Sequence, residues 1–146
     1  MHLPFYIACA LPFFLAVITA PLVFKYFARA SGWAHLAERY QCHALFEGTR
    51  YRFESIHWSG MNLFGMNYGG IVTFGTNSNG LYICLFFIFR PFHPPLLIPW
   101  SDIRRRQYKK FLRNAYELTF PSMPKITMQV SKRIYDQTEG RCQVEG

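Results

Sequence analysis

Residues 3–24 contain no charged side chain, and this run limits most strongly what the chain can fold into. As a helix rising about 1.5 Å per residue, the run would match a hydrocarbon core about 30 Å thick. A cleaved signal peptide is the rival interpretation, since Ala28, Arg29 and Ala30 resemble a cleavage site. The run exceeds the roughly 7–15 apolar residues of signal peptides, and no basic segment precedes it. We therefore expect residues 1–28 to form a transmembrane anchor.

Basic residues follow the run directly, beginning with Lys25 and Arg29. The positive-inside rule then predicts a single-pass protein with its N-terminus outside and its C-terminal domain in the cytoplasm. Cysteines in that compartment stay reduced. The four cysteines include no CxxC pair and the histidines are scattered, so we expect no metal site and no cofactor.

About 120 residues remain beyond the anchor, enough for one small domain. Phe, Tyr and Trp make up 18% of the chain, which suits a thin core filled by large rings. The net charge of +8 lies wholly outside the apolar run. A basic body beside a membrane points first to an anionic phospholipid surface as a partner.

Residues 29–48 are expected to form an amphipathic juxtamembrane helix and a linker. Trp33, Leu36, Ala37 and Tyr40 follow the i, i+3, i+4, i+7 spacing of one helical face, and Ser31 is the expected N-cap. Gly32 should separate this helix from the anchor. The face could pack on the following domain, or Trp33 and Tyr40 could anchor the helix among lipid headgroups. Both alternatives stay open.

From residue 49 the pattern changes to the period of two that is typical of half-buried strands. Gly60 and Gly65 interrupt the first strand, and Gly69 and Gly70 predict a bulge in the second. Turn residues at 75–80 then predict a hairpin between residues 66–74 and 81–89. Residues 81–100 could form a second membrane span, but Arg90 and four prolines favour two buried strands.

Further strands are expected at residues 103–111, 116–120 and 126–130, followed by a short helix capped by Ser131. The predicted fold class is therefore α+β and mainly β. An antiparallel barrel or bent sandwich occupies residues 49–138, and residues 139–146 form a tail.

Three sequence pieces carry a resemblance to a known family. These pieces are Gly80-Leu81-Tyr82, Phe89-Arg90 and the run from His93 to Ile103, which includes "IPWSDI". Together they resemble the strand-loop-strand core of bacterial pleckstrin-homology-like domains, above all in membrane-anchored members. The resemblance covers residues 49–136. It implies a bent barrel closed by a C-terminal helix, a bacterial inner-membrane location, and a fold used for binding lipids, peptides and proteins.

Two surfaces are candidates for binding. Prolines flank Leu96, Leu97 and Ile98, which indicates an edge strand that could accept a strand from a partner. Residues 102–113 hold six basic residues against one acid, and these could bind anionic lipid: Arg104, Arg105, Arg106, Lys109, Lys110 and Arg113. The same residues could instead be a solvated edge that discourages aggregation.

Catalysis and nucleic-acid binding are less favoured. Ser55, His57, His93 and Asp102 supply hydrolase residue types, but no GxSxG, HExxH or phosphate-binding motif accompanies them. Tyr108 and Phe111 could stack on bases, although an anchored domain has restricted access to nucleic acid. The sequence therefore predicts a non-catalytic binding or scaffold module. We expect an accessory subunit or assembly factor of an integral membrane complex, or a homo-oligomer. The alternative is anionic-lipid sensing through residues 104–113. A small membrane-bound hydrolase is a minor alternative.

Overall fold

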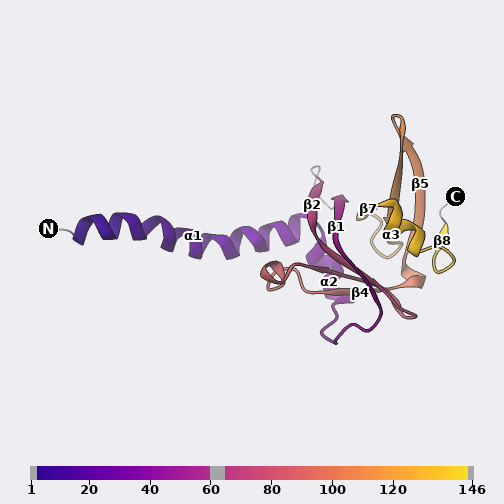
Figure 1. Cartoon of the computed structure of the whole chain (residues 1–146), viewed down its shortest axis with the longest axis horizontal. Coiled ribbons are helices and arrows are strands. Elements are labelled where there is room, and N and C mark those ends of the chain that lie inside the picture. Colours follow the sequence, from indigo (N-terminus) through magenta and orange to yellow (C-terminus); the bar gives the residue numbers. More distant parts are fainter. Residues whose placement is uncertain (1–2, 60–64, 145–146) are drawn as a thin grey trace.

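The computed structural model describes residues 3–59 and 65–144, with side chains from residue 10 onward. Residues 1 and 2 of the predicted anchor, the predicted break at Gly60 and the last two residues of the predicted tail lie outside this range. Figure 1 shows a long N-terminal helix leading into a β domain.

The first helix, α1 (Leu3–Ala30), extends away from the β domain, and residues 11–19 are exposed along it (Figure 1). Over residues 10–30 it is long and apolar enough to cross a membrane, a property that a signal sequence shares. It continues beyond the uncharged run through Lys25 and Arg29. The expected N-terminal apolar helix is therefore present.

A left-handed residue separates α1 from α2 (Trp33–Tyr40), since Gly32 has φ 86°. The predicted separation at Gly32 is confirmed. Glycine adopts this conformation readily because it has no Cβ. The predicted N-cap position is wrong by one residue: Gly32 holds that position, and it makes no side-chain capping hydrogen bond. Ser31 lies one residue earlier, where its Oγ accepts a hydrogen bond from the Trp33 amide at 3.3 Å.

In the described part of the chain, eight strands form a single open sheet in the order β4-β3-β2-β1-β7-β6-β5-β8. The β5–β8 pair is parallel and the other pairs are antiparallel. The strands are β1 (Thr49–Ser59), β2 (Met66–Thr76), β3 (Gly80–Leu85), β4 (Leu96–Pro99), β5 (Arg104–Lys110), β6 (Arg113–Thr119), β7 (Thr127–Val130) and β8 (Gln143–Val144). The predicted α+β, mainly β class is confirmed. The sheet bends but keeps two edges, and β8 was not expected in the tail.

Irregular pairing between β1 and β2 accompanies the bend. The register shifts between Tyr51 and Glu54 and again between Glu54 and Ile56. Gly70, opposite the second shift, has φ 67°, so the predicted glycine bulge is confirmed. In Figure 1 β4 runs across the view while β5 runs nearly upright, so the two ends of the sheet point in different directions.

The apolar segment after β3 leaves the sheet earlier than predicted. The strand ends at Leu85, and a single turn of 3-10 helix, η1 (Phe87–Phe89), follows it. The Phe86 amide donates to the Ile71 carbonyl at 2.9 Å, after which the chain turns back toward β4. A second short turn, η2 (Trp100–Asp102), follows β4. Residues 81–100 thus contain two strands, and the second-span alternative is wrong.

The core lies between the sheet and the buried face of α2. Trp33, Leu36, Ala37 and Tyr40 are all buried, so the alternative in which this face packs on the domain is confirmed. The last helix, α3 (Lys132–Gln137), is capped as predicted, because the Ser131 Oγ accepts a hydrogen bond from the Ile134 amide at 3.4 Å.

Candidate functional site

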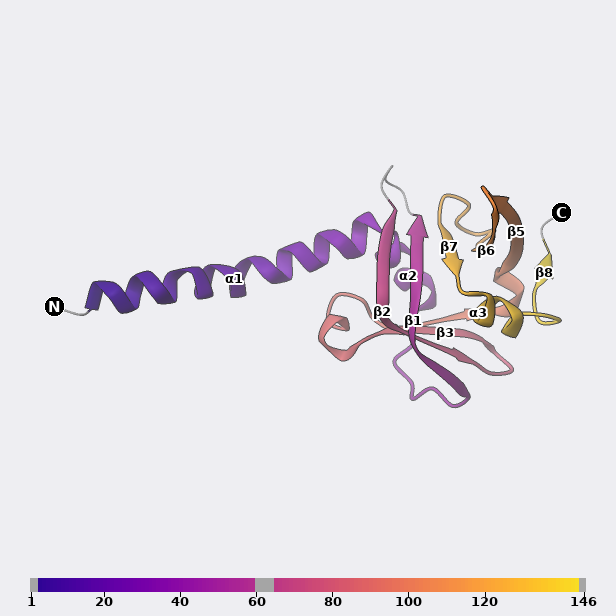
Figure 2. The same ribbon diagram turned by 45° about the horizontal axis from the view of Figure 1, so that its top comes forward.

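The β5–β6 hairpin carries all six of the predicted basic residues and projects from the β domain. Its register pairs Arg104 with Thr119 at one end and Lys110 with Arg113 at the other. This pairing leaves a two-residue turn, Phe111 and Leu112. In both ribbon views the hairpin lies on the part of the domain away from α1 (Figures 1 and 2).

The turn is unusual in both composition and conformation. Phe111 is 97% exposed and Leu112 is fully exposed, although both are large and apolar. Phe111 also has φ 56°, at the first turn position, where a hairpin turn with a positive φ ordinarily has glycine. Such strain costs about 1–3 kcal/mol and is concentrated at functional sites. A turn built for stability alone would use neither residue.

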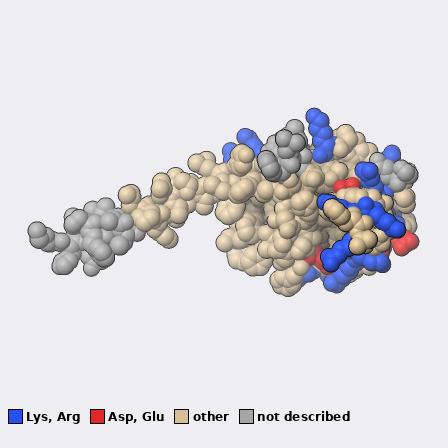
Figure 3. Space-filling model, turned by 90° about the horizontal axis from the view of Figure 1, so that it is seen from above, with Lys and Arg blue, Asp and Glu red and all other residues tan. Residues whose placement is uncertain are grey.

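Cations surround this apolar pair. We call Lys109, Lys110, Phe111, Leu112 and Arg113 the hairpin tip, and all five side chains are exposed. Figure 3 looks at the domain from above the view of Figure 1, and Lys and Arg side chains gather at the end far from α1 with uncharged atoms between them. The cations were identified from the sequence. Phe111 was expected at the end of the strand 103–111, as a possible base-stacking ring, and Leu112 was given no binding role; the missed signal was an apolar pair where that strand ends.

The three consecutive arginines of β5 do not act as one surface. Arg104 and Arg106 point outward, and Arg106 lies 3.9 Å from Glu117. Arg105 is buried at 8% exposure, because alternate side chains of a strand face opposite sides of the sheet. Its guanidinium lies 4.1 Å from the centroid of the Tyr135 ring and donates to the Tyr135 carbonyl at 3.4 Å. Arg105 as a lipid-binding or partner-binding residue is therefore corrected to a packing residue.

This placement predicts unequal effects of two alanine substitutions on the free energy of unfolding. Arg105→Ala should lower it by about 1–2 kcal/mol, through loss of the cation–π contact and of the carbonyl hydrogen bond. Lys109→Ala, at the exposed tip, should change it by less than about 0.5 kcal/mol. Denaturant titration of the full chain in detergent micelles measures both values. Equal effects would contradict the assignment of Arg105 to the core.

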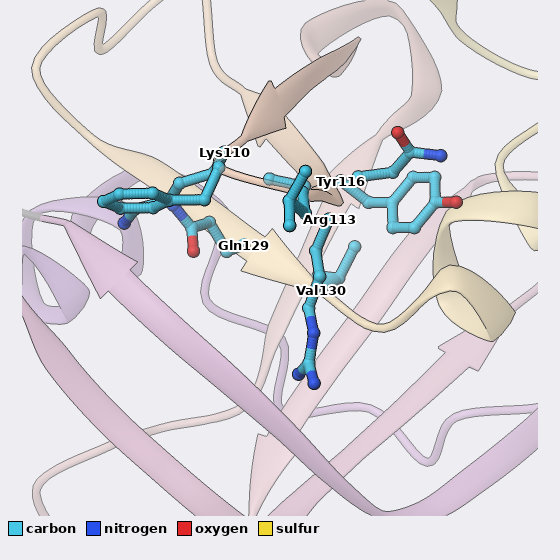
Figure 4. Close-up of a pocket in the computed structure, with 9 residues that line it drawn as sticks. Lys110, Arg113, Tyr116, Gln129 and Val130 are labelled. Atoms are coloured by element: carbon cyan, nitrogen blue, oxygen red, sulfur yellow. The ribbon is translucent and has the colours of Figure 1, made fainter.

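A groove lies beside the hairpin tip. Its volume is about 760 Å³, and β6 and β7 form one side of it. Figure 4 shows Lys110, Arg113, Tyr116, Gln129 and Val130 around the groove. The amide of Gln129 donates to the hydroxyl of Tyr108 at 2.8 Å, which fastens β7 to the hairpin. The tip and the groove form one surface with apolar and cationic parts.

The predicted edge strand is present as β4, but the chain itself covers part of its outer edge. Leu96 forms an isolated antiparallel bridge with Gln41, and the Cys42 amide donates to the Pro95 carbonyl at 2.8 Å. Pro99 supplies no amide donor. Leu96 and Ile98 are buried in the core and Leu97 is half-buried. The edge left for a partner strand is therefore very short.

The two predicted interfacial anchors lie inside the domain. Trp33 is completely buried, and its Nε1 donates to the Pro94 carbonyl at 2.9 Å. The Tyr40 hydroxyl donates to Asp102 Oδ2 at 2.7 Å, and burial raises the pKa of Tyr40. The prediction that Trp33 and Tyr40 anchor the helix among headgroups is therefore wrong, because both rings are buried in the core of the domain.

The residue types considered for catalysis have separate partners. The buried His93 lies 3.1 Å from the Tyr68 hydroxyl, whereas Asp102 accepts a hydrogen bond from Tyr40. The Ser55 Oγ accepts a hydrogen bond from the Gly70 amide. Within residues 10–59 and 65–144, whose side chains are described, no three His, Cys, Asp or Glu side chains come together as metal ligands.

Comparisons of this chain with protein-family models, with curated proteins and with solved structures find no match.

Proposed function

We propose that this protein is a non-catalytic, membrane-anchored binding module that serves as an accessory subunit or assembly factor of a membrane protein complex. The observation that carries the proposal is the hairpin tip, where two exposed apolar side chains sit on a strained turn between cations. Exposed apolar residues on a rigid hairpin suit the centre of a protein interface, and a charged rim suits its edge.

The surroundings of the hairpin tip favour a protein as its partner. With α1 across a bilayer, the hairpin lies at the far end of the domain and projects to the side of the helix axis (Figures 1 and 2). A surface placed there can meet the cytoplasmic part of a neighbouring membrane protein. The complementary partner surface would hold an apolar pocket with acidic residues around it.

We also propose a membrane location for the protein and a fold family for its β domain. Lys25 and Arg29 at the end of α1 support a cytoplasmic β domain with the N-terminus outside, in a bacterial inner membrane. The strand order supports a pleckstrin-homology-like domain, because strands β1–β4 and strands β5–β7 form two consecutive meanders with a helix after the last one.

The alternative role of residues 104–113 as an anionic-lipid sensor has weaker support. Arg105 is buried, which removes one cation from the surface. Arg106 has a carboxylate partner in Glu117. The hairpin also lies away from α1, so its cations would reach the bilayer only if the domain lay flat against it.

The test is a mild-detergent purification of the tagged full chain, with partners quantified by mass spectrometry. The double variant Phe111→Ser/Leu112→Ser should reduce recovery of a stoichiometric membrane partner about tenfold, because central apolar anchors dominate interface energy. Leu45→Ser is the matched control, since Leu45 is an apolar residue that is 93% exposed at another place on the surface.

Three outcomes of this purification are informative. A partner that the hairpin-tip variant loses and the Leu45 variant keeps supports the proposal. Recovery of the protein alone contradicts it. Equal recovery with the hairpin-tip variant contradicts the role of the hairpin, even if a complex exists.

A further inference from the structure

A second cationic site lies on the outer face of β1, β2 and β3. It is a pocket of about 250 Å³ that we call the arginine pocket. Three guanidinium side chains line it, from Arg50, Arg52 and Arg90, and no Asp or Glu is among its lining residues. Cations gathered without a carboxylate favour an anionic ligand.

Two of the three arginines are held in place by backbone carbonyls. Arg50 Nη2 donates to the Phe46 carbonyl at 2.6 Å, and Arg90 Nε donates to the Leu85 carbonyl at 3.4 Å. Each contact uses one nitrogen and leaves further donors of the guanidinium available. Arg52 is exposed and forms no ion pair with an acid in the described part of the chain. The pocket therefore has two guanidinium groups that are held in place and keep free donors, and a third that is exposed.

The buried wall of the pocket adds a neutral donor. Tyr82, 8% exposed, and Cys84, 3% exposed, both line it. Burial, with a smaller effect of the Cys84 thiol, raises the pKa of Tyr82 to about 12, although the charges of Arg90 and Arg50 oppose this shift. The phenol therefore keeps its proton at neutral pH and does not neutralise the arginines.

The pocket borders an exposed apolar loop. Phe86 is 50% exposed, Phe87 is 65% exposed and Ile88 is 60% exposed, and the first two also line the pocket. In both ribbon views the loop before β4 projects from the domain toward the side from which α1 arrives (Figures 1 and 2). If α1 crosses a bilayer, a loop placed there would bring its exposed apolar residues close to that bilayer.

Contacts between aromatic rings place the segment that follows β3 beside the end of the uncharged part of α1. The Phe24 ring lies 5.4 Å from the Phe89 ring and 6.1 Å from the Phe92 ring, centroid to centroid. Phe24 is the last residue of the uncharged run, and Lys25 follows it. The loop therefore lies at the level where hydrocarbon gives way to headgroups if α1 spans the membrane.

Backbone strain occurs at the same site. Phe53 lines the pocket, is 76% exposed and has φ 61°. A bulky residue in this conformation is rare and points to function. The register shift between Tyr51 and Glu54 includes Arg52 and Phe53, so the irregularity bears directly on how the two side chains are presented.

We propose that the arginine pocket binds the phosphate of an anionic phospholipid, with the loop at residues 86–88 among the headgroups and upper acyl chains. Guanidinium groups pair with phosphate oxygens through two parallel hydrogen bonds. The cytoplasmic leaflet supplies anionic lipid, and apolar side chains beside the pocket retain its acyl chains. The inference rests on α1 being a membrane span, which belongs to the proposed function. It does not depend on the hairpin tip.

The test measures lipid retained by the full chain after purification in detergent with equal amounts of phosphatidylglycerol and phosphatidylcholine. Native mass spectrometry should show wild-type protein retaining phosphatidylglycerol preferentially. Arg52→Gln/Arg90→Gln should reduce this retention roughly tenfold, since two charge-assisted contacts are lost. Lys109→Gln/Lys110→Gln removes the same charge at the hairpin tip and should leave retention unchanged. Equal loss in both variants, or equal retention of phosphatidylcholine, overturns the proposal.

A competition experiment separates a lipid headgroup from a free phosphate ion. Dihexanoyl phosphatidylglycerol should displace the retained lipid at concentrations far below those needed with inorganic phosphate. Equal potency of the two competitors overturns the lipid assignment. Alkaline carbonate extraction of membranes tests α1 separately: release of the protein shows that the span itself is wrong. If the protein stays in the membrane but the Arg52→Gln/Arg90→Gln variant retains as much phosphatidylglycerol as the wild type, the lipid site alone is wrong.

Discussion

Replacing Trp33 with alanine should lower the free energy of unfolding by about 4 kcal/mol, because the substitution opens a cavity in a fully packed core. Trp33 has no exposed surface, and its ring lies 5.3 Å from Trp58 and 5.4 Å from His93, centroid to centroid. The substitution also leaves the Pro94 carbonyl without the donor that now lies 2.9 Å away. The substitution thus removes the packing of a fully buried ring and a hydrogen bond together.

Circular dichroism of the full chain in detergent micelles, followed through denaturant or heat, measures this loss. Trp33→Phe keeps most of the ring volume and removes the indole donor, so its expected cost is about 1–2 kcal/mol. This second variant keeps the test informative if Trp33→Ala fails to fold. A Trp33→Ala protein as stable as the wild type would contradict the position of α2 in the core.

The size of this effect follows from where α2 lies. α2 connects α1 to the sheet, with Gly32 at the corner and Trp33, the first residue of α2, buried in the core. The Gly32 Cα leaves little room, since an added Cβ would lie 2.9 Å from Ile126 Cδ1. Contacts on both sides of the corner join α1 to the β domain.

The sequence predicted those features that depend on local pattern. The absence of charge predicted α1, and the spacing of Trp33, Leu36, Ala37 and Tyr40 predicted the buried face of α2. Turn residues between β2 and β3 predicted their hairpin, and Ser131 predicted the start of α3. In each case the cause of the helix, turn or cap lies in a few residues that are neighbours in the sequence.

Features that depend on distant partners could not be predicted in this way. Arg105 belongs to a basic run that indicates an exposed surface, yet a ring 30 residues later covers it. Phe86 continues the apolar pattern of β3, yet the strand has already ended at Leu85. The segment that follows packs on α1 instead, through the contact of Phe89 with Phe24. β8 has two residues and no pattern, because the edge of β5 supplies its pairing.

The arginine pocket, which we propose as a lipid site, could not be predicted from the sequence for the same reason. Its three arginines are separated by up to 40 positions in the sequence, and the pairing of β1 with β2 and of β2 with β3 brings them together. The hairpin tip, in contrast, is a contiguous segment. Its cations were predicted for that reason, whereas the importance of Phe111 and Leu112 emerged only from their exposure and backbone conformation.

Acidification should weaken the domain through His93, by about 2 kcal/mol between pH 7 and pH 5. Burial lowers the pKa of His93 from its ordinary value of 6.5 to about 4, against a smaller opposing effect of the Phe89 carbonyl. The unfolded chain therefore binds a proton more readily than the folded one in this range. The stabilisation is complete above pH 6.5 and is lost as the pH falls toward 4. Denaturant titrations at several pH values measure the slope.

His93→Gln should flatten this slope, because it removes the titrating group while keeping a polar side chain. His43→Gln is the matched control: His43 is exposed, so the slope should remain. An unchanged slope in the His93 variant would contradict the prediction.

The position of His93 gives this titration a structural consequence. The His93 ring lies 3.1 Å from the Tyr68 hydroxyl, which donates to Ser31 Oγ at 3.2 Å, and Ser31 in turn donates to the Ala28 carbonyl at 3.3 Å. This chain of hydrogen bonds joins the loop before β4 to the last turn of α1. A charge on His93 would therefore act first where α1 meets the β domain, so loss of amide-exchange protection at Ser31 and Trp33 should precede loss in β6 and β7.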